Sequence, residues 1–398
     1  ALSLTNADWA LWIDADESLD QKSIGAIKSA IIRPHFGGYT IPVINYLSEE
    51  HTLDQLIHYP IRLFRNLPGI RFEGRVHEQI GNAIARSGLP IARLENALIH
   101  HFGYRPKEMQ EKGKHQRNIV LIQKALSENP QDEFQWFNLA NSYYNAGDWE
   151  STIACCEKAE FSLNPSLPYA QLAFQIWALS LYNLRRYEEG LQVCQKAQRI
   201  GINGPLIEYT TACVLRALKR LPEALSHAKR ASQIPLREHE VGDITISAYK
   251  ALCLQGEILA EMGESASAVQ ILQEVKKRAE PLWHARLLLI QQLHRLGDYD
   301  SALCESEEII NHFRDTLSAS ESRGLPNNHP ARVACELAIL AAKKKGLQAK
   351  RLEYLEQAFR FAPTERNLWS RWLQYAVEIQ DWGNALKAYL EGLERFSL

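Results

Sequence analysis

A short turn that recurs along the second part of the chain limits the possible folds more than any other feature. It first occurs at Gly147-Asp148-Trp149, inside a segment with helical spacing of apolar residues. Equivalent turns follow at Arg185–Tyr187, Lys219–Leu221, Gly263–Ser265, Gly297–Tyr299 and Gln380–Trp382. Most of the spacings between them lie between about 34 and 44 residues, close to the period of about 34 residues that is typical of helix-pair repeats. The sequence therefore predicts a row of stacked helix pairs.

Longer spacings between these turns are explained by insertions at about 235–246 and 314–330. The last gap has room for one further repeat, the weakest of the series, with Ala358 and Pro363 at its late small and proline positions.

Small residues recur at fixed places relative to the turns. They are Ala140, Ala178, Ala212 and Gly256 before a turn, and Ala224, Ala268, Ala302 and Ala385 after one. Closely packed helices need small side chains where they meet, and each pair buries its apolar face only against the next pair. The aromatic residues at these spacings are therefore expected in the core and not along a ligand-binding stripe.

The first of these units resembles a tetratricopeptide repeat (TPR). Trp136, Leu139, Ala140 and Tyr143 fit the pattern of its first helix, with Ala159 in the second. From this resemblance we expect residues 133–398 to form an all-α solenoid of about seven helix pairs. The resemblance also implies a concave face that binds a protein or peptide partner.

The N-terminal part has a different pattern, in which an apolar run stops abruptly in carboxylates. The run Trp9–Ile13 carries no charge and is expected to be a strand buried on both faces. Asp14 and Asp16 follow it, and in an extended chain their side chains point the same way. Two carboxylates so close need a hard cation or a proton between them, and we favour a divalent metal. The alternative is an acidic helix start with Asp16 or Ser18 as N-cap.

Further local patterns predict a small mixed α/β region. Residues 20–32 have the spacing of a helix packed on one face, whereas 39–46 and 59–65 are rich in β-branched and aromatic residues and are expected to be strands. Residues 48–58 are polar and are expected to be a loop. The next segment, 70–80, gathers two cations, two carboxylates and an imidazole around Gly74.

Two of these motifs together resemble family 2 glycosyltransferases of the GT-A fold. The first is the string Asp8–Glu17, and the second combines R-L-F-R-N at 62–66 with R-F-x-G-x-V-H-E at 71–78. The branch that it resembles includes bacterial proteins with helical repeats attached. We therefore expect an α/β fragment, the C-terminal half of a GT-A-like domain at 1–105, a linking helix at 106–132, and the all-α TPR solenoid. In that family the nucleotide-binding half precedes the first motif, so we expect this chain to lack it and to have little activity alone.

The resemblance also suggests a role for each candidate residue. It implies that Asp14 and Asp16 bind the Mn²⁺ or Mg²⁺ of a nucleotide-sugar donor. His77 is a candidate for a further ligand, because a neutral imidazole is a common third ligand. The segment 97–104 contains an apolar run that ends in two histidines, His100 and His101, and either of them competes with His77 for this role. A guanidinium suits a diphosphate, so Arg62, Arg65, Arg71 and Arg75 are candidates for donor binding.

Inverting transfer needs a carboxylate that takes the proton from the acceptor, and Glu78 is the candidate for this catalytic base. The competing interpretation is structural. In it His77 packs against the sheet and Glu78 pairs with Arg75.

Composition limits the partners and the compartment. A formal net charge of −2 gives no reason to expect a nucleic-acid-binding surface, and no apolar run is long enough to span a membrane. Seven scattered Cys, with no C-x-x-C pair, suggest reduced thiols in a cytoplasmic protein.

Two hypotheses follow from the sequence. The first is a metal-dependent inverting glycosyltransferase whose repeats recruit a polypeptide. The second is an interaction protein in which a catalytic remnant caps the repeats.

Overall fold

The computed structural model describes residues 2, 5–33, 35–47, 54–73, 79–94, 96–103, 114–159, 164–279, 282–317 and 325–396. The chain divides into two compact units, Ala1–Ala251 and Leu252–Leu398. The first contains the strands and the first helix pairs, and the second contains only helices. The expected domain boundaries at residues 105 and 132, which separate the GT-A-like fragment, the linking helix and the repeats, stay predictions.

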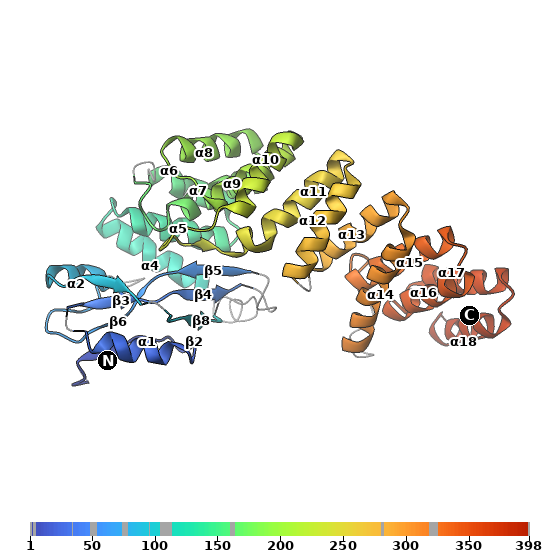
Figure 1. Ribbon diagram of the computed structural model, residues 1–398, viewed down its shortest axis with the longest axis horizontal. Coiled ribbons are helices and arrows are strands. Elements are labelled where there is room, and N and C mark those ends of the chain that lie inside the picture. Colours follow the sequence, from blue (N-terminus) through green and yellow to red (C-terminus); the bar gives the residue numbers. More distant parts are fainter. Residues whose placement is uncertain are drawn as a thin grey trace. The chain divides into compact units, whose positions relative to one another are not determined.

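Two small mixed sheets form the N-terminal part of the first unit (Figure 1). One has the order β1 (Trp9–Leu11), β6 (Ile61–Arg65), β3 (Gly38–Thr40) and β7 (Ile91–Arg93). The other has the order β2 (Glu17–Leu19), β8 (Ile99–His101), β4 (Val43–Tyr46), β5 (Gln55–His58) and β9 (Gly242–Asp243). β3 is parallel to β7 and β4 to β8, and the other pairs are antiparallel.

Two prolines divide the chain between the sheets. The segment expected to be one strand at 39–46 is split at Pro42 into β3 and β4, and Pro60 separates β5 from β6. Proline has no N–H for a sheet ladder, so each strand breaks there. The carbonyl of Pro60 accepts the N–H of Ile41 at 3.0 Å, which holds the two breaks side by side. The expectation of a loop at 48–58 was wrong for β5.

The first strand is shorter and more exposed than expected. β1 ends at Leu11 and pairs with β6 at one end of the order of its sheet. Leu11 is 37% exposed and Ile13 39%. The expectation of full burial on both faces was therefore wrong. Trp9 packs against one core cluster and Ala10 and Trp12 against another, but each is buried only in part, because an edge strand has no neighbouring strand on its outer side.

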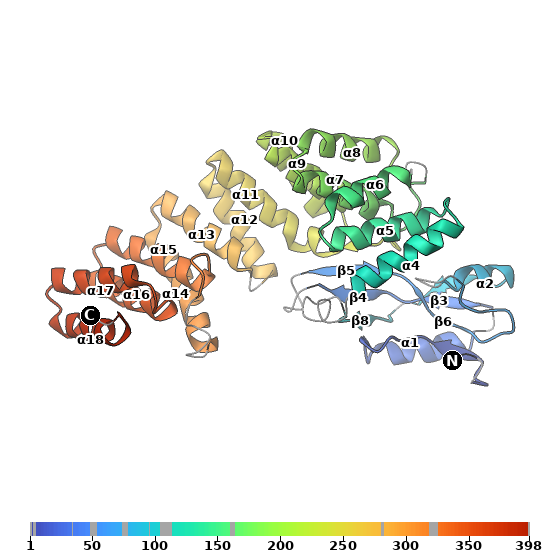
Figure 2. The same ribbon diagram turned by 180° about the vertical axis from the view of Figure 1, so that it is seen from behind.

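Helix α1 (Ser23–Ile31) covers one face of the sheets, and the expected helix at 20–32 is confirmed with slightly shorter bounds. The core between them contains Tyr39, Val43, Leu63 and Ile99. Figures 1 and 2 show α4 (Lys114–Glu128) and α5 (Glu133–Asn145) on the opposite side of the sheets, and α2 (Gly81–Arg86) near one end.

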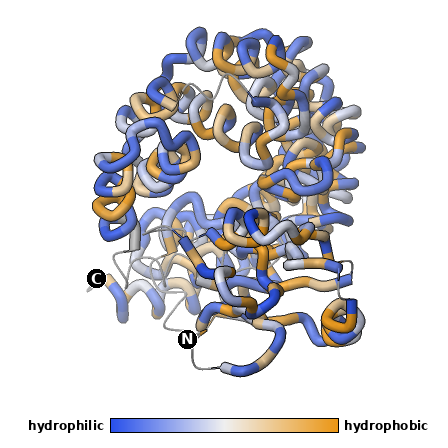
Figure 3. Tube along the Cα trace, turned by 90° about the vertical axis from the view of Figure 1, so that its left-hand side faces the viewer, coloured by the Kyte–Doolittle hydropathy of each residue, from blue (hydrophilic) through white to orange (hydrophobic). Residues whose placement is uncertain are grey.

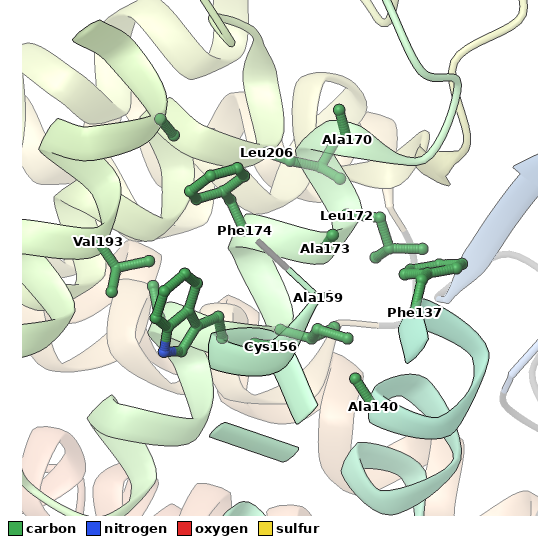
Figure 4. Close-up of a cluster of buried hydrophobic side chains, with 14 of the residues drawn as sticks. Phe137, Ala140, Cys156, Ala159, Ala170, Leu172, Ala173, Phe174, Val193 and Leu206 are labelled. Carbon is green, nitrogen blue, oxygen red and sulfur yellow. The ribbon is translucent and has the colours of Figure 1, made fainter. Parts of the chain in front are cut away.

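Three helix pairs complete the first unit. They are α5 with α6 (Trp149–Lys158), α7 (Ala170–Asn183) with α8 (Tyr187–Arg199), and α9 (Pro205–Ala217) with α10 (Leu221–Gln233). Phe137, Cys156, Phe174 and Leu206 meet in their shared core (Figure 4). Along the helices of the chain hydrophilic and hydrophobic stretches alternate (Figure 3), as expected of helices with one buried side.

Four more pairs form the second unit. They are α11 (Ala251–Met262) with α12 (Ser265–Arg278), α13 (Trp283–Leu296) with α14 (Tyr299–Thr316), α15 (Pro330–Lys344) with α16 (Gln348–Phe361), and α17 (Arg366–Glu378) with α18 (Trp382–Phe396). In the described part of the chain, no helix is long and apolar enough to cross a membrane. All seven cysteines are free thiols.

The turn within each pair has one backbone geometry. Its first residue has a positive φ, and the next N–H donates to the carbonyl five residues earlier, as from Asp298 to Leu293 at 3.0 Å. This is the Schellman motif, which suits glycine because an L side chain is strained at positive φ. The first residues are Gly147, Arg185, Lys219, Gly263, Gly297, Gly346 and Gln380.

The insertion at 235–246 joins the third helix pair to the sheet. It contains β9, which pairs with β5, and it leads into a π-helical turn, η3 (Ile246–Lys250), that continues into α11. The ammonium of Lys250 lies 2.6 Å from Asp243 and also pairs with Asp54. Burial alone lowers the pKa of Lys250, but the carboxylates of Asp243 and Asp54 outweigh it and raise the pKa overall. The first compact unit therefore extends to residue 251.

Candidate functional site

The loop between β1 and β2 carries the three carboxylates and leads from one sheet into the other. It is a tight turn, because the N–H of Glu17 donates to the carbonyl of Asp14 at 3.0 Å, and the N–H of Asp14 donates to Glu17 Oε2 at 2.9 Å. The segment is therefore not extended. As a result Asp14 and Asp16 have different neighbours.

Asp14 and Glu17 share one guanidinium. Arg62 Nη2 donates to Asp14 Oδ2 at 3.3 Å and to Glu17 Oε1. Asp14 Oδ1 also accepts from the indole of Trp12 at 2.9 Å, and its side chain is 45% exposed. The Glu17 side chain is only 1% exposed. Burial raises the pKa of Glu17 above its ordinary value, and the hydrogen bond from Asp14 and the charge of Arg62 offset this only in part.

Asp16 faces a different group, the imidazole of His101. Asp16 Oδ1 lies 3.3 Å from His101 Nε2. Gly103 allows this contact, because a Cβ there would lie 2.2 Å from Asp16 Oδ2 and 2.8 Å from the imidazole nitrogen. His101 Nδ1 is 2.7 Å from Asn45 Oδ1, and the amide nitrogen of Asn45 is 3.0 Å from His58 Nδ1. A polar chain thus runs from Asp16 across the second sheet to His58.

The carboxylates present fit a hard divalent metal in their chemistry, since carboxylate oxygen is the ligand that Mn²⁺ and Mg²⁺ prefer, and an imidazole nitrogen can complete the set at Mn²⁺ more readily than at Mg²⁺. Asp16 and His101 offer such a pair. Within the described residues, however, no third His, Cys, Asp or Glu completes a cluster with them. His100 is directed elsewhere, with its Nδ1 2.8 Å from the hydroxyl of Tyr46 and its Nε2 3.5 Å from Asp20. His77 lies outside the described residues.

A cleft of about 720 Å³ opens beside this loop, between the sheets and α5. Its sheet side includes Trp12, Asp14, Asn45, His58, Arg62 and Phe72. Its helix side includes Phe134, Phe137, Asn138, Asn141, Asn145 and Tyr169. The lining therefore combines a carboxylate, a guanidinium, amides and aromatic rings, which together can bind a polar ligand with flat or ring-shaped parts.

The candidate arginines do not converge. Arg62 lines the cleft, whereas Arg65 donates to the carbonyl of Phe36 at 3.1 Å and its guanidinium lies 5.0 Å from the ring centre of Trp9. Arg71 donates to the carbonyls of Leu67 and Ile70. The proposed base Glu78, its alternative partner Arg75 and His77 all lie outside the described residues. Their roles stay predictions.

Sequence reasoning did not single out several polar residues at this site. Asn45 lies in the segment 39–46 that was expected to be a strand, and His58 lies in the segment 48–58 that was expected to be a loop, so neither was assigned a role at a site. The asparagines of α5 follow one another at intervals of three and four residues, which places them on one helix face. That spacing is a signal that can be found in a sequence, whereas the link from Asn45 to His101 depends on strand pairing.

Comparison with known proteins gives partial matches. No protein-family model matches the chain. A TPR repeat-containing protein of Synechococcus elongatus is 27% identical over 154 residues, which is 37% of each chain. The glycosyltransferase SunS, derived from the SPbeta prophage of Bacillus subtilis, is 30% identical over 131 residues, or 33% of this chain and 30% of SunS. The chain thus spans about a third of the length of the curated relatives it matches.

Solved structures match as well. The C-terminal part of a TPR repeat-containing protein from Cytophaga hutchinsonii has a TM-score of 0.48 at 12% identity, over 66% of this chain and 96% of that one. YrrB, described as a TPR protein with an unusual peptide-binding site, has a TM-score of 0.33 at 19% identity, over 62% of this chain and 94% of that one. The helix pairs of this chain, their common turn and the Synechococcus relative together identify its repeats as TPR-like.

Proposed function

We propose that this chain is part of a metal-dependent, inverting glycosyltransferase, and that the cleft beside the Asp14–Glu17 loop binds the nucleotide-sugar donor. The observation that carries the proposal is the position of this loop, whose Asp14 and Arg62 line the cleft. The local similarity to the glycosyltransferase SunS supports the same interpretation. The TPR-like helix pairs are proposed to bind a protein or peptide partner, and the protein is proposed to act in the cytoplasm.

In this proposal Asp14, Asp16 and one histidine would hold Mn²⁺ or Mg²⁺, which would offset the negative charge of the donor diphosphate. Asp14 would have to turn from Arg62 toward Asp16 to join such a site. Among the described histidines, His101 is the best candidate because of its contact with Asp16. His77 is the other candidate. Arg62 lines the cleft and is the first candidate for the diphosphate, and Arg65, Arg71 and Arg75 remain further candidates. Glu78 is proposed to accept the proton of the acceptor group.

A second candidate function is a scaffold that binds proteins without catalysis. One observation favours it. Asp14 and Glu17 are already paired with Arg62, so these carboxylates have a structural partner without a metal. In that case the sheets would only cap the repeats.

Manganese binding separates the two functions without any need for turnover. Free Mn²⁺ can be followed by electron paramagnetic resonance during titration of the full chain, and nucleotide-sugar binding by calorimetry with and without Mn²⁺. We expect one Mn²⁺ site that is lost in Asp14→Asn and in Asp16→Asn. The matched control is Asp8→Asn, an exposed aspartate just before β1. Equal Mn²⁺ binding in all variants would favour the scaffold, whereas saturable binding of a nucleotide-sugar that requires Mn²⁺ would favour the glycosyltransferase.

A further inference from the structure

A second group of potential metal ligands lies in the all-helical unit, separate in sequence from the Asp14–Glu17 loop. Cys253 and Glu257 are four residues apart on α11, so they lie on one face of that helix. His284 is in the first turn of α13 and faces them. Within the described residues, these three form the group of His, Cys, Asp or Glu side chains whose ligand atoms all lie within 4.8 Å of one another.

The three ligand atoms form a small triangle. Cys253 Sγ is 3.1 Å from His284 Nε2 and 3.7 Å from Glu257 Oε1, and the last two atoms are 3.9 Å apart. A triangle with these sides has a centre about 2.1 Å from each corner, and zinc ligands lie at about 2.0–2.3 Å. An ion at or just above this centre thus reaches all three atoms with little movement of the helices.

The ligand types select the metal. Thiolate and imidazole favour Zn²⁺ over Mg²⁺ or Ca²⁺, which prefer oxygen ligands. Cys253 is buried, Glu257 is partly exposed and His284 is 63% exposed on its side chain. The site is therefore open to solvent on the histidine side, where water can take the fourth position of a tetrahedral zinc ion.

We propose that Cys253, Glu257 and His284 bind a Zn²⁺ ion that links α11 to α13. These two helices are the first members of consecutive helix pairs. The ion then fastens one repeat to the next, and it differs in chemistry from the metal proposed at the oxygen-rich loop. The site does not depend on whether the chain is an enzyme or a scaffold.

Cobalt gives a direct test, because Co²⁺ replaces Zn²⁺ and reports its ligands by absorption. The full chain is freed of metal with a chelator and titrated with Co²⁺ at neutral pH. We expect a thiolate-to-cobalt charge-transfer band and the intense visible bands of tetrahedral Co²⁺, both removed by one equivalent of Zn²⁺. Burial raises the pKa of Cys155 and of Cys194 to about 12, which disfavours their thiolates at neutral pH, and neither belongs to a group of three ligand-type side chains among the described residues.

Three variants assign the bands. Cys253→Ser is expected to abolish the charge-transfer band, whereas Cys304→Ser, which changes an exposed thiol on α14, is expected to leave it intact. His284→Gln is expected to weaken Co²⁺ binding by more than about 100-fold, and its exposed position means that the variant still folds. Absence of a charge-transfer band in the parent, its survival in Cys253→Ser, or unchanged affinity in His284→Gln would overturn the proposal.

Discussion

Removing the guanidinium of Arg62 is expected to destabilise the first unit strongly, because it leaves Glu17 without its cation. The Arg62 side chain is 11% exposed and that of Glu17 is 1% exposed. A carboxylate that is so deeply buried cannot replace the lost ion pair with hydrogen bonds to water. The change to test is Arg62→Met, which keeps the length and apolar stem of the side chain.

The magnitude follows from the burial of each contact. Breaking a buried pair by removing one partner costs about 3–5 kcal/mol. The contact with Asp14 adds little, because that side chain is 45% exposed and exposed pairs contribute about 0–1 kcal/mol. The expected loss of about 3–5 kcal/mol corresponds to roughly a 150- to 5,000-fold loss of protection against exchange.

The loss should also depend on pH. The folded-state pKa of Glu17 is raised above 4.5, so folding binds a proton and stability falls as pH rises from 4.5 through that pKa. Without Arg62 the folded pKa rises further. The penalty of Arg62→Met is therefore expected to be smaller near pH 5 than near pH 7.5.

Hydrogen exchange of the paired amides of β1 and β6, detected by mass spectrometry and referenced to unstructured peptides at each pH, measures both effects. Arg65→Met is the matched control, since Arg65 lies on the same strand and its guanidinium contacts the carbonyl of Phe36 and the indole ring of Trp9. We expect about 1 kcal/mol there. The double variant Arg62→Met/Glu17→Gln should recover most of the stability. Equal losses in Arg62→Met and Arg65→Met, or a loss independent of pH, would refute the reasoning.

Two further predictions concern the repeats. Lys250→Met removes the cation that pairs with the partly buried carboxylate of Asp243, so we expect a loss of stability of about 1–3 kcal/mol. Hydrogen exchange of the β9 amides should become faster, and unchanged exchange there would contradict the prediction. At the Schellman turns we expect Gly297→Ala to lower stability by about 1 kcal/mol through backbone strain alone, since a Cβ there meets no atom within 4 Å. Arg185→Gly, which relieves the same strain, is expected to raise stability by about 0.5–1 kcal/mol. Thermal denaturation measures both, and shifts of the melting temperature in the same direction would contradict the reasoning.

The repeat region could be predicted from the sequence because its signals are local. The six turns that were recognised by their residues all lie between the two helices of a pair. They could be recognised because the Schellman geometry favours glycine at its positive-φ position and tolerates few other residues there. The seventh turn, at Gly346, was not recognised, because Leu347 follows it where each of the other six turns has Asp, Glu or Arg. The predicted small residues Ala140, Ala178, Ala212 and Ala224 are all fully buried.

The sheets and the candidate site could be predicted only in part, because their geometry depends on residues far apart in the chain. The strand signals at 39–46 and 59–65 were found, but the breaks at Pro42 and Pro60 divide the chain between two sheets. β9 pairs with β5 across almost two hundred residues, and no local pattern indicates such a partner. The direction of Asp14 was misjudged for the same reason, since Arg62 comes from another strand.

Asn138 offers a last prediction, because this residue on α5 has a polar atom that is costly to bury. It lines the cleft and is 7% exposed, and its amide nitrogen has no hydrogen-bond partner in the described part of the structure. A buried amide without a partner costs about 1–3 kcal/mol, so its presence at the cleft suggests that a bound ligand accepts its hydrogen bond. Asn138→Leu has a similar volume and is expected to keep or slightly raise stability.

The same substitution should lower the affinity for a cleft ligand by roughly 5- to 30-fold, the equivalent of about 1–2 kcal/mol. Calorimetry with the nucleotide-sugar or peptide that binds the parent chain measures this, and thermal denaturation measures stability. Asn311→Leu is the matched control, because this asparagine of α14 is exposed and does not line the cleft. A clear loss of stability in Asn138→Leu with unchanged affinity would show that Asn138 supports the packing of α5, and that the first repeat helix contributes only a wall to the cleft.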